Sequence, residues 1–290
     1  MFDNIFAAIE KWMRELLTGM VESNMSTMFT DVNEKTSEIA AQVGRTPQNW
    51  NSSVFSMIQN LSESVVVPIA GIIITLVLCY ELISMLTERN NLHDVDTWMF
   101  FKYFVKAWVA IYLVSNTFTI TMAVFDVGQS VVNSASGIIN GETAIDVSSL
   151  SMQMQAAMAT MEIGELVVLA LETFLVSFCM KIMSVVITVI VYGRMIEIYL
   201  YTSLAPIPFA TMSNREWGHV GTNYFRGLFA LAFQAFLMMV CVAIYAALIS
   251  SVRISSNMHS ALIGVAAYTA ILCFSLMKTG SLSKQIFGSH

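Results

Sequence analysis

The stretch that decides the fold is IGELVVLALETFLVSFCMKIMSVVITVIVYGRMIEIYLY, residues 163–201, followed directly by TSLAPIPFA, residues 202–210. The first stretch contains no proline, and its two glycines stand near its ends. Leu, Ile, Val, Met and Phe dominate it, which predicts one unbroken helix. At about 1.5 Å per residue this helix is about 60 Å long, whereas the hydrocarbon core of a bilayer is roughly 30 Å thick. One end must therefore leave the membrane, and the two prolines that follow end the helix in an elbow.

Composition sets the class of protein. Hydrophobic residues make up 56% of the 290 positions and charged residues only 12%, whereas soluble domains carry about 25% charged residues. The sequence therefore predicts an all-α integral membrane protein. The net charge of −6 is modest and argues neither for nucleic-acid binding nor for attachment to acidic lipid surfaces.

The apolar runs predict about five transmembrane helices in a membrane domain that covers residues 64–277. We expect the spans at about 65–86, 102–125, 163–201, 227–250 and 258–277. Between them lie an outer loop at 126–162 and a cytoplasmic segment at 202–226, and residues 278–290 form a short tail. Periodicity reveals no repeat between the two halves of the chain, so the inverted-repeat plan of many secondary transporters is not supported.

The N-terminal region, residues 1–63, is more polar. It opens with an amphipathic helix, because apolar residues recur at spacings of three and four at Phe2, Ile5, Phe6, Ile9, Trp12, Met13, Leu16, Leu17 and Met20. This helix could pack on the protein's own surface, or it could lie in the membrane interface or dock a partner. Residues 23–60 are rich in Asn, Ser and Thr and predict short helices and turns outside the membrane.

Basic residues indicate the orientation. The segment 126–162 holds four acidic residues and no Lys or Arg, which places it outside the cytoplasm under the positive-inside rule. Eight of the fourteen basic residues then fall near span ends on the cytoplasmic side: Arg89, Lys102, Lys106, Arg194, Arg215, Arg226, Lys278 and Lys284. This arrangement predicts an N-terminus outside and a C-terminus in the cytoplasm.

Three charged residues lie within or near the hydrocarbon depth, namely Glu81, Glu172 and Lys181. An unpaired charge at that depth costs about 2.5 kcal/mol or more, so these residues need partners or water. Lys181 could meet Glu81 if the first and third spans pack side by side. Such a pair would fix packing; alternatively, the charged groups line a hydrated path.

Arg194 and Glu197 are three residues apart and could form a simple helix pair that braces the elbow.

Motifs for catalysis or cofactor binding are absent from the sequence. It contains no GxxxxGK[ST] phosphate loop, no HExxH and no GxSxG. The four cysteines lie in apolar runs without CxxC spacing, and the four histidines are scattered. We therefore expect no enzyme activity, no bound metal and no cofactor.

Three short runs near the elbow resemble a known family. They are GRMIEIY (193–199), LAPIPFA (204–210) and EW (216–217) followed by NYFR (223–226). In this order and spacing they look like the central motif of the TrbL-like polytopic subunits of conjugative type IV secretion systems, a group that includes the sixth VirB component. The resemblance covers most of residues 65–277 and singles out Arg194, Glu197, Pro206, Pro208, Trp217, Asn223 and Arg226. The short tail departs from longer relatives, which carry a large terminal extension.

The resemblance implies a non-enzymatic channel or scaffold subunit in the cytoplasmic membrane of bacteria. It implies a ring-like oligomer whose partners are the lipid bilayer, copies of itself, and other inner-membrane subunits and ATPases of the secretion machine. Transferred DNA or protein would be passing cargo, because the sequence offers no basic groove with interleaved aromatic residues. Two alternatives stay open: a secondary transporter or ion channel that uses the buried Glu and Lys groups, and a purely structural membrane anchor.

Overall fold

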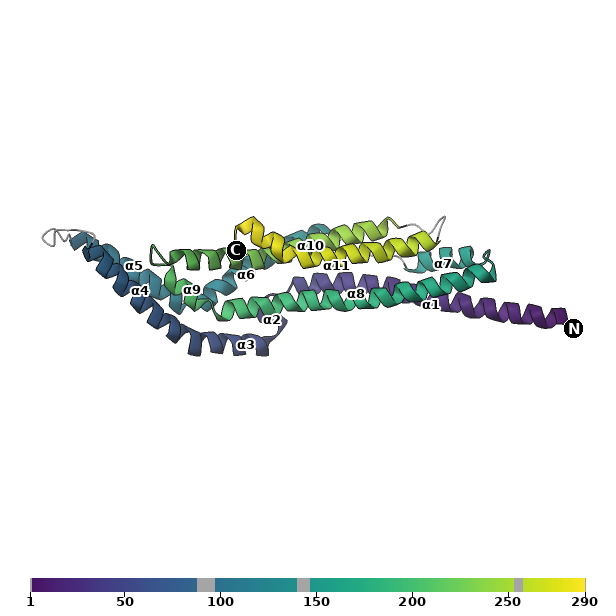
Figure 1. The fold of residues 1–290 in the computed structure, drawn as a ribbon, viewed down its shortest axis with the longest axis horizontal. Helices are drawn as coiled ribbons and strands as arrows, with labels where there is room; N and C mark the ends of the chain where they lie inside the picture. The colour runs from purple at the N-terminus through teal and green to yellow at the C-terminus, as the bar shows by residue number, and fades with distance from the viewer. Residues whose placement is uncertain (1, 88–96, 140–146, 253–257, 290) are drawn as a thin grey trace. The chain divides into compact units, whose positions relative to one another are not determined.

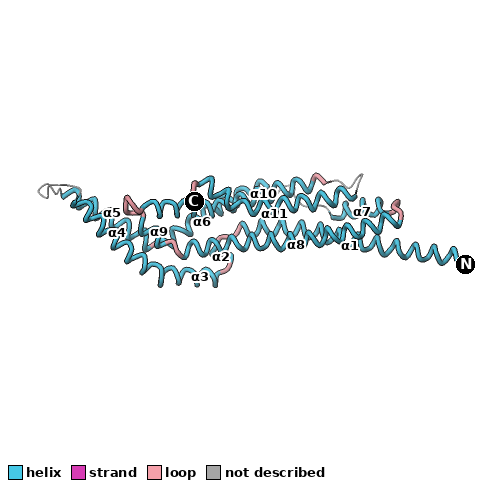
Figure 2. Tube along the Cα trace, in the orientation of Figure 1, coloured by secondary structure: helices cyan, strands magenta, loops and turns pink. Residues whose placement is uncertain are grey.

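Helices joined by short loops make up the described chain (Figures 1 and 2). The computed structural model describes residues 2–87, 97–139, 147–252 and 258–289. Within these ranges every regular element is helical and no strand occurs. The prediction of an all-α protein is confirmed.

Five helical stretches in the described ranges are long and apolar enough to cross a membrane. They are the stretch Ser52–Thr87, composed of α3 (Ser52–Leu61), the π-helical segment η1 (Ser62–Val66) and α4 (Val67–Thr87), followed by α5 (Thr97–Ser115), α8 (Ile163–Ser203), α10 (Gly218–Ser250) and α11 (Met258–Phe287). The predicted number of spans is confirmed. The very long central helix is also confirmed, because α8 is one helix of 41 residues.

The chain divides into two compact units. Unit 1 comprises residues 1–43, 134–191 and 238–278, and unit 2 comprises residues 44–133, 192–237 and 279–290. Helices α6 (Thr117–Ile139), α8, α10 and α11 each contribute residues to both units. Unit 1 contains twelve of the twenty acidic residues and six of the fourteen basic ones, so the net negative charge of the chain belongs to unit 1.

In unit 1, helix α1 (Phe2–Val43) runs along the first half of α8. Three hydrogen bonds connect α1 with α8 or with the turn just before α8. Arg14 donates to the carbonyl of Met161 in that turn at 2.8 Å, Asn24 donates to the Thr173 hydroxyl at 3.4 Å, and Lys35 donates to the Thr188 hydroxyl at 3.1 Å. The residue numbers rise together on both sides of these contacts. Helices α1 and α8 are therefore parallel neighbours.

Helix α1 is longer than the amphipathic pattern indicated. Residues 23–43 were expected to form short helices and turns, but they continue the helix to Val43. A narrow stripe of buried side chains at spacings of three and four runs through the polar sequence, at Val21, Met25, Met28, Phe29, Val32, Ile39 and Val43. The prediction of turns was wrong because packing of this stripe outweighs the low helix propensity of the Asn, Ser and Thr residues around it.

In the first turns of α1, by contrast, large apolar side chains remain exposed. They are between 46% and 68% exposed, at Ile5, Phe6, Ile9, Trp12, Leu16 and Met20. About half or more of the surface of each of these side chains is therefore left uncovered by the described chain. A membrane interface or a partner that covers this face stays a prediction.

In unit 2, helix α5 ends one residue before α6 (Thr117–Ile139) begins, where the sequence predicted one continuous span at 102–125. At this point Asn116 donates a side-chain hydrogen bond to the Tyr112 carbonyl, and the Thr117 hydroxyl donates to the Leu113 and Val114 carbonyls. Helical backbone hydrogen bonds continue across this point, from the Asn116 N–H to the Tyr112 carbonyl at 3.1 Å and from the Ile120 N–H to the Asn116 carbonyl at 3.0 Å. The segment predicted as the second span is therefore divided between α5 and α6 at the single residue Asn116.

The segment predicted as the outer loop, 126–162, is largely helical. Helix α6 continues to Ile139, and α7 (Val147–Met158) follows and packs on α1 within unit 1. Residues 140–146 of this segment lie outside the described residues. The glycines and serines that indicated a loop are compatible with helix here because apolar residues lie between them in the sequence.

Candidate functional site

The elbow after α8 is seated between two spans of unit 2. Helix α9 (Pro206–Thr211) begins with Pro206 in its first turn and packs against both α4 and α5. Four alanines line the contact, Ala70 on α4, Ala110 on α5, and Ala205 and Ala210 at the elbow, and each is at most 5% exposed. Small residues let helices approach closely. The elbow is therefore held by backbone proximity to both spans.

The start of α10 closes over the elbow at Gly221. A Cβ atom at this position would lie 2.1 Å from Met212 Cγ and 2.5 Å from the Pro208 carbonyl oxygen. The second contact is with backbone, which cannot move aside as a flexible side chain can. Only glycine fits here, so α9 and α10 are packed at a fixed separation.

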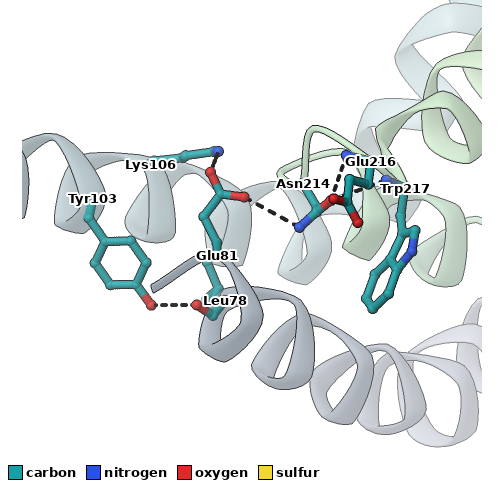
Figure 3. Close-up of polar contacts among 7 residues, drawn as sticks. All are labelled: Leu78, Glu81, Tyr103, Lys106, Asn214, Glu216 and Trp217. Carbon is teal, nitrogen blue, oxygen red and sulfur yellow. Dashed lines mark hydrogen bonds and ion pairs between the residues drawn. The ribbon is translucent and has the colours of Figure 1, made fainter. Parts of the chain in front are cut away.

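A polar network joins α4 and α5 to the turn after the elbow (Figure 3). Glu81 on α4 stands between two donors: Lys106 of α5 donates to Oε1 at 2.5 Å, and Asn214 donates to Oε2 at 3.3 Å. One turn away, the Tyr103 hydroxyl of α5 donates to the Leu78 carbonyl at 3.0 Å. The Glu81 side chain is 18% exposed and that of Lys106 is 40% exposed. Both carboxylate oxygens of Glu81 are therefore satisfied in a partly buried setting.

Asn214 connects this network to the start of α10. Its Oδ1 accepts from the backbone N–H of Glu216 at 2.7 Å and of Trp217 at 3.1 Å, and its carbonyl accepts from the N–H of Gly218 at 2.8 Å. Asn side chains commonly cap helix starts in this way. Asn214 is 3% exposed. One buried residue thus shapes the turn before α10 and binds the carboxylate of α4.

Trp217 lies at the edge of the same network. Its ring stacks on Tyr80 of α4 with centroids 5.5 Å apart, and the Tyr80 hydroxyl donates to the Glu216 carboxylate at 3.0 Å. Trp217 is 43% exposed. This combination of a stacked face and an exposed edge is typical of an aromatic anchor at a membrane interface.

The sequence suggested Lys181 as a possible partner of Glu81, but Glu81 pairs with Lys106. Lys181 belongs to the part of α8 in unit 1, whereas Glu81 belongs to unit 2. From the sequence, Lys106 was expected only to lie among the basic residues near span ends on the cytoplasmic side. Helices α4 and α5 are neighbours in the sequence and in unit 2, so α5 supplies the counter-charge.

Arg194 and Glu197 do not form the expected i, i+3 pair within the described residues. Glu197 accepts from Lys284 of α11 at 3.1 Å, with both side chains nearly half exposed. Arg194 is 7% exposed and donates to the Leu231 carbonyl of α10 at 3.5 Å, while its Nε is buried without a partner in the described chain. The two residues therefore bind different neighbours of α8.

The other intramembrane charges belong to unit 1. Glu172 forms an ion pair with His259 at the start of α11. Lys181 is exposed on α8 and makes no ion pair or hydrogen bond with another described residue. The structure thus separates the three predicted charges into two partnered carboxylates and one lysine without a partner in the described chain.

The remaining motif residues lie in the first turns of α10. Asn223 is half-buried, and Arg226 is exposed. The described residues contain no group of three or more His, Cys, Asp or Glu side chains that could hold a metal ion. The network around Glu81 joins α4, α5 and the turn before α10 through hydrogen bonds that satisfy both of its carboxylate oxygens, which is an arrangement suited to fixing geometry.

Sequence reasoning missed Asn214 and the partner role of Lys106. A signal for Asn214 existed, because Asn is frequent in turns, where its side chain binds backbone N–H groups two or three residues further on. For Lys106, no signal in the sequence distinguishes a paired lysine from one that reaches the interface.

The model of the family described as TrbL/VirB6 plasmid conjugal transfer like protein matches residues 32–206. This range includes the run 193–199 and the first part of the elbow, and it ends before Trp217, Asn223 and Arg226. Searches among curated proteins and among solved structures gave no match.

Proposed function

Because the chain belongs to the TrbL/VirB6 plasmid conjugal transfer-like family, we propose that it assembles with copies of itself into a ring-like channel or scaffold of a type IV secretion machine. Membership makes it a membrane subunit of conjugal transfer, associated with other components of that system. Together with the five membrane-length helices, it makes the chain a multi-pass protein of the bacterial inner membrane. In our proposal the subunit performs no catalysis, and DNA or protein passes as cargo.

Uncovered apolar surface supports self-assembly. In the apolar windows of the first span, α5 and α8, only 22%, 17% and 22% of the residues are buried, against 56% for α10. The exposed side of α8 in unit 1 carries large side chains at spacings of three and four, at Val168, Leu171, Leu175, Phe178, Ile182, Val185 and Val189. Lipid or a second helix can cover such a stripe.

Lys181 is the observation that carries the proposal. It stands on this stripe of α8, between Phe178 and Ile182, and has no partner in the described chain. A lysine facing lipid at the bilayer centre costs about 2.5–3.5 kcal/mol. A neighbouring copy that supplies carbonyl oxygens, or a hydrated passage between copies, removes this penalty. A packed oligomer therefore explains Lys181 better than a monomer surrounded by lipid.

The transporter alternative has less support from the geometry. A coupling site needs charged groups that are free to bind the transported solute, yet Glu81 pairs with Lys106 and Glu172 pairs with His259. We propose instead that these pairs fix helix packing. Inner-membrane subunits and ATPases of the machine are the proposed further partners.

Cysteine cross-linking tests the assembly on the proposed face. Cys179 is exposed on α8, one turn from Leu175 and Ile182 of the stripe and on the opposite edge of the stripe from Lys181. In a variant that keeps only this thiol, with Cys79→Ser, Cys241→Ala and Cys273→Ala, a bifunctional maleimide should yield dimers and higher species in native membranes. A cysteine-free variant is the matched control. Monomer alone from the Cys179 variant would contradict a contact between copies along this face.

A further inference from the structure

A pocket lies between α5 and the elbow of unit 2. Its volume is about 350 Å³, within the range of about 300–1,000 Å³ typical of ligand sites. Its apolar lining comes from α5 and from the elbow, at Val109, Leu113, Phe209 and Met212. Its polar lining consists of Lys106 and Ser213. The pocket therefore suits a ligand with a long apolar part and a polar end.

The polar end has unused hydrogen-bonding capacity. An ammonium group has three donors, and Lys106 uses one of them for Glu81 at 2.5 Å. Glu81 also accepts a hydrogen bond from the Asn214 amide, so its carboxylate does not need a second hydrogen bond from Lys106. The Ser213 hydroxyl is buried and has no hydrogen-bond partner in the described chain. Leaving such a group unpaired is unfavourable, so a ligand oxygen that accepts from it would be stabilised.

The face of α5 that leads to the pocket changes from aromatic and basic side chains to aliphatic side chains along the helix. Trp98, Lys102 and Lys106 follow at intervals of four residues, and Val109 and Leu113 continue the same face. Lys102 is exposed, and its Nζ lies 5.6 Å from the centroid of the Trp98 ring. Aromatic rings and lysines are typical of the headgroup level of a bilayer, and aliphatic side chains of the acyl level. The order along α5 matches a phospholipid from headgroup to tail.

We propose that this pocket binds an anionic phospholipid. Its phosphate would accept from Lys106 and Ser213, with Lys102 as the second cation, and an acyl chain would lie along Val109, Leu113 and Met212. Two lysines against one carboxylate leave the local charge positive, which favours an anionic headgroup over a zwitterionic one. Through Lys106 and the elbow residues, the lipid would touch the same junction that Glu81 and Asn214 connect. The proposal requires only that the chain lies in a membrane, so it stands independently of ring assembly.

Native mass spectrometry of the full chain released from nanodiscs tests the proposal. The discs would contain phosphatidylglycerol and phosphatidylcholine of identical acyl chains in equal amounts. We expect each chain to retain phosphatidylglycerol preferentially, and inorganic phosphate should not displace it, because the acyl contacts contribute to binding. Equal retention of the two lipids by the wild-type chain would overturn the proposal without any reference to a variant.

Three variants locate the site. Val109→Phe fills the pocket and should abolish selective retention, whereas Val105→Phe adds the same bulk on α5 at an exposed residue that does not line the pocket and should leave retention unchanged. Lys102→Gln should lower the preference for phosphatidylglycerol about fivefold, which is the effect of about one lysine near a membrane surface. Unchanged retention in Val109→Phe, or occupation of the pocket by a second copy of the chain, would refute the site.

Discussion

The amide of Asn214 is the residue-scale centre of the junction between α4, α5 and α10. It donates to Glu81 and accepts from two backbone N–H groups, and it is almost fully buried. Asn214→Ala removes all three side-chain bonds and leaves buried groups unpaired, so we expect a loss of about 2–3 kcal/mol in stability. Heating in detergent, followed by size-exclusion chromatography of the surviving protein, measures this loss. Asn60→Ala changes an exposed asparagine of the same unit and should have little effect; equal melting of both variants would argue against the role of Asn214.

Gly221 gives a second residue-scale prediction. A methyl group there would collide with the Pro208 carbonyl and with Met212, so Gly221→Ala should destabilise the chain by about 1–3 kcal/mol. Gly71→Ala is the matched control, because Gly71 lies in α4 with nothing within 4 Å of the added carbon. There the same substitution should be neutral or stabilising by up to about 1 kcal/mol. The same thermal assay compares the two, and a tolerated Gly221→Ala would show that the elbow and α10 are not closely packed.

At the scale of elements, the ion pair of Glu81 and Lys106 ties α4 to α5. Glu81→Gln and Lys106→Gln should each lower stability, and the double variant should lose less than the sum, with a coupling energy of about 0.5–3 kcal/mol. Lys181→Met combined with Glu81→Gln should show no such coupling, because Lys106 and Asn214 already bind the two carboxylate oxygens of Glu81. A double-mutant cycle on thermal stability distinguishes the two pairs. Coupling of Glu81 to Lys181 would contradict the observed pairing.

The sequence predicted elements well where local chemistry dominates. Helix α8 was recognisable because 39 mostly apolar residues contain no proline and have glycines only near their ends, and the elbow was recognisable from Pro206 and Pro208. Helix α1 was underestimated because its continuity depends on a buried stripe whose partner, α8, lies more than a hundred residues away. The division at Asn116 was missed because a single polar residue in an apolar span is usually tolerated within a helix.

The candidate site was only partly predictable because tertiary packing decides which charged residues become partners. Glu81 was identified as a charged residue in need of a partner, and Arg194 and Glu197 as a possible pair on one helix, but charge alone does not specify the partner. Lys106, Leu231 and Lys284 become partners through the packing of α5, α10 and α11, and that packing is a property of tertiary structure. Asn214 was overlooked because its sequence context indicated only a turn.

At the scale of the whole molecule, the distribution of basic residues gives a prediction of orientation. Of the eight residues predicted to be cytoplasmic, Lys278 belongs to unit 1, and the other positions fall in unit 2, where Arg89 lies outside the described residues. We propose that the N-terminus is outside the cytoplasm and the C-terminus inside. A fluorescent protein that matures only in the cytoplasm should be bright when fused after residue 290, and an alkaline phosphatase should be active when fused before residue 1. Reversed signals would contradict this orientation.

Assembly into a ring is the central claim, and the mass and symmetry of the protein test it most directly. Native mass spectrometry of the chain in nanodiscs, combined with image averaging of the same sample, gives both quantities. The account predicts several copies around an axis, with the face of α8 that carries Lys181 directed toward a neighbouring copy or an axial opening. A stable monomer whose α8 stripe faces lipid would contradict it.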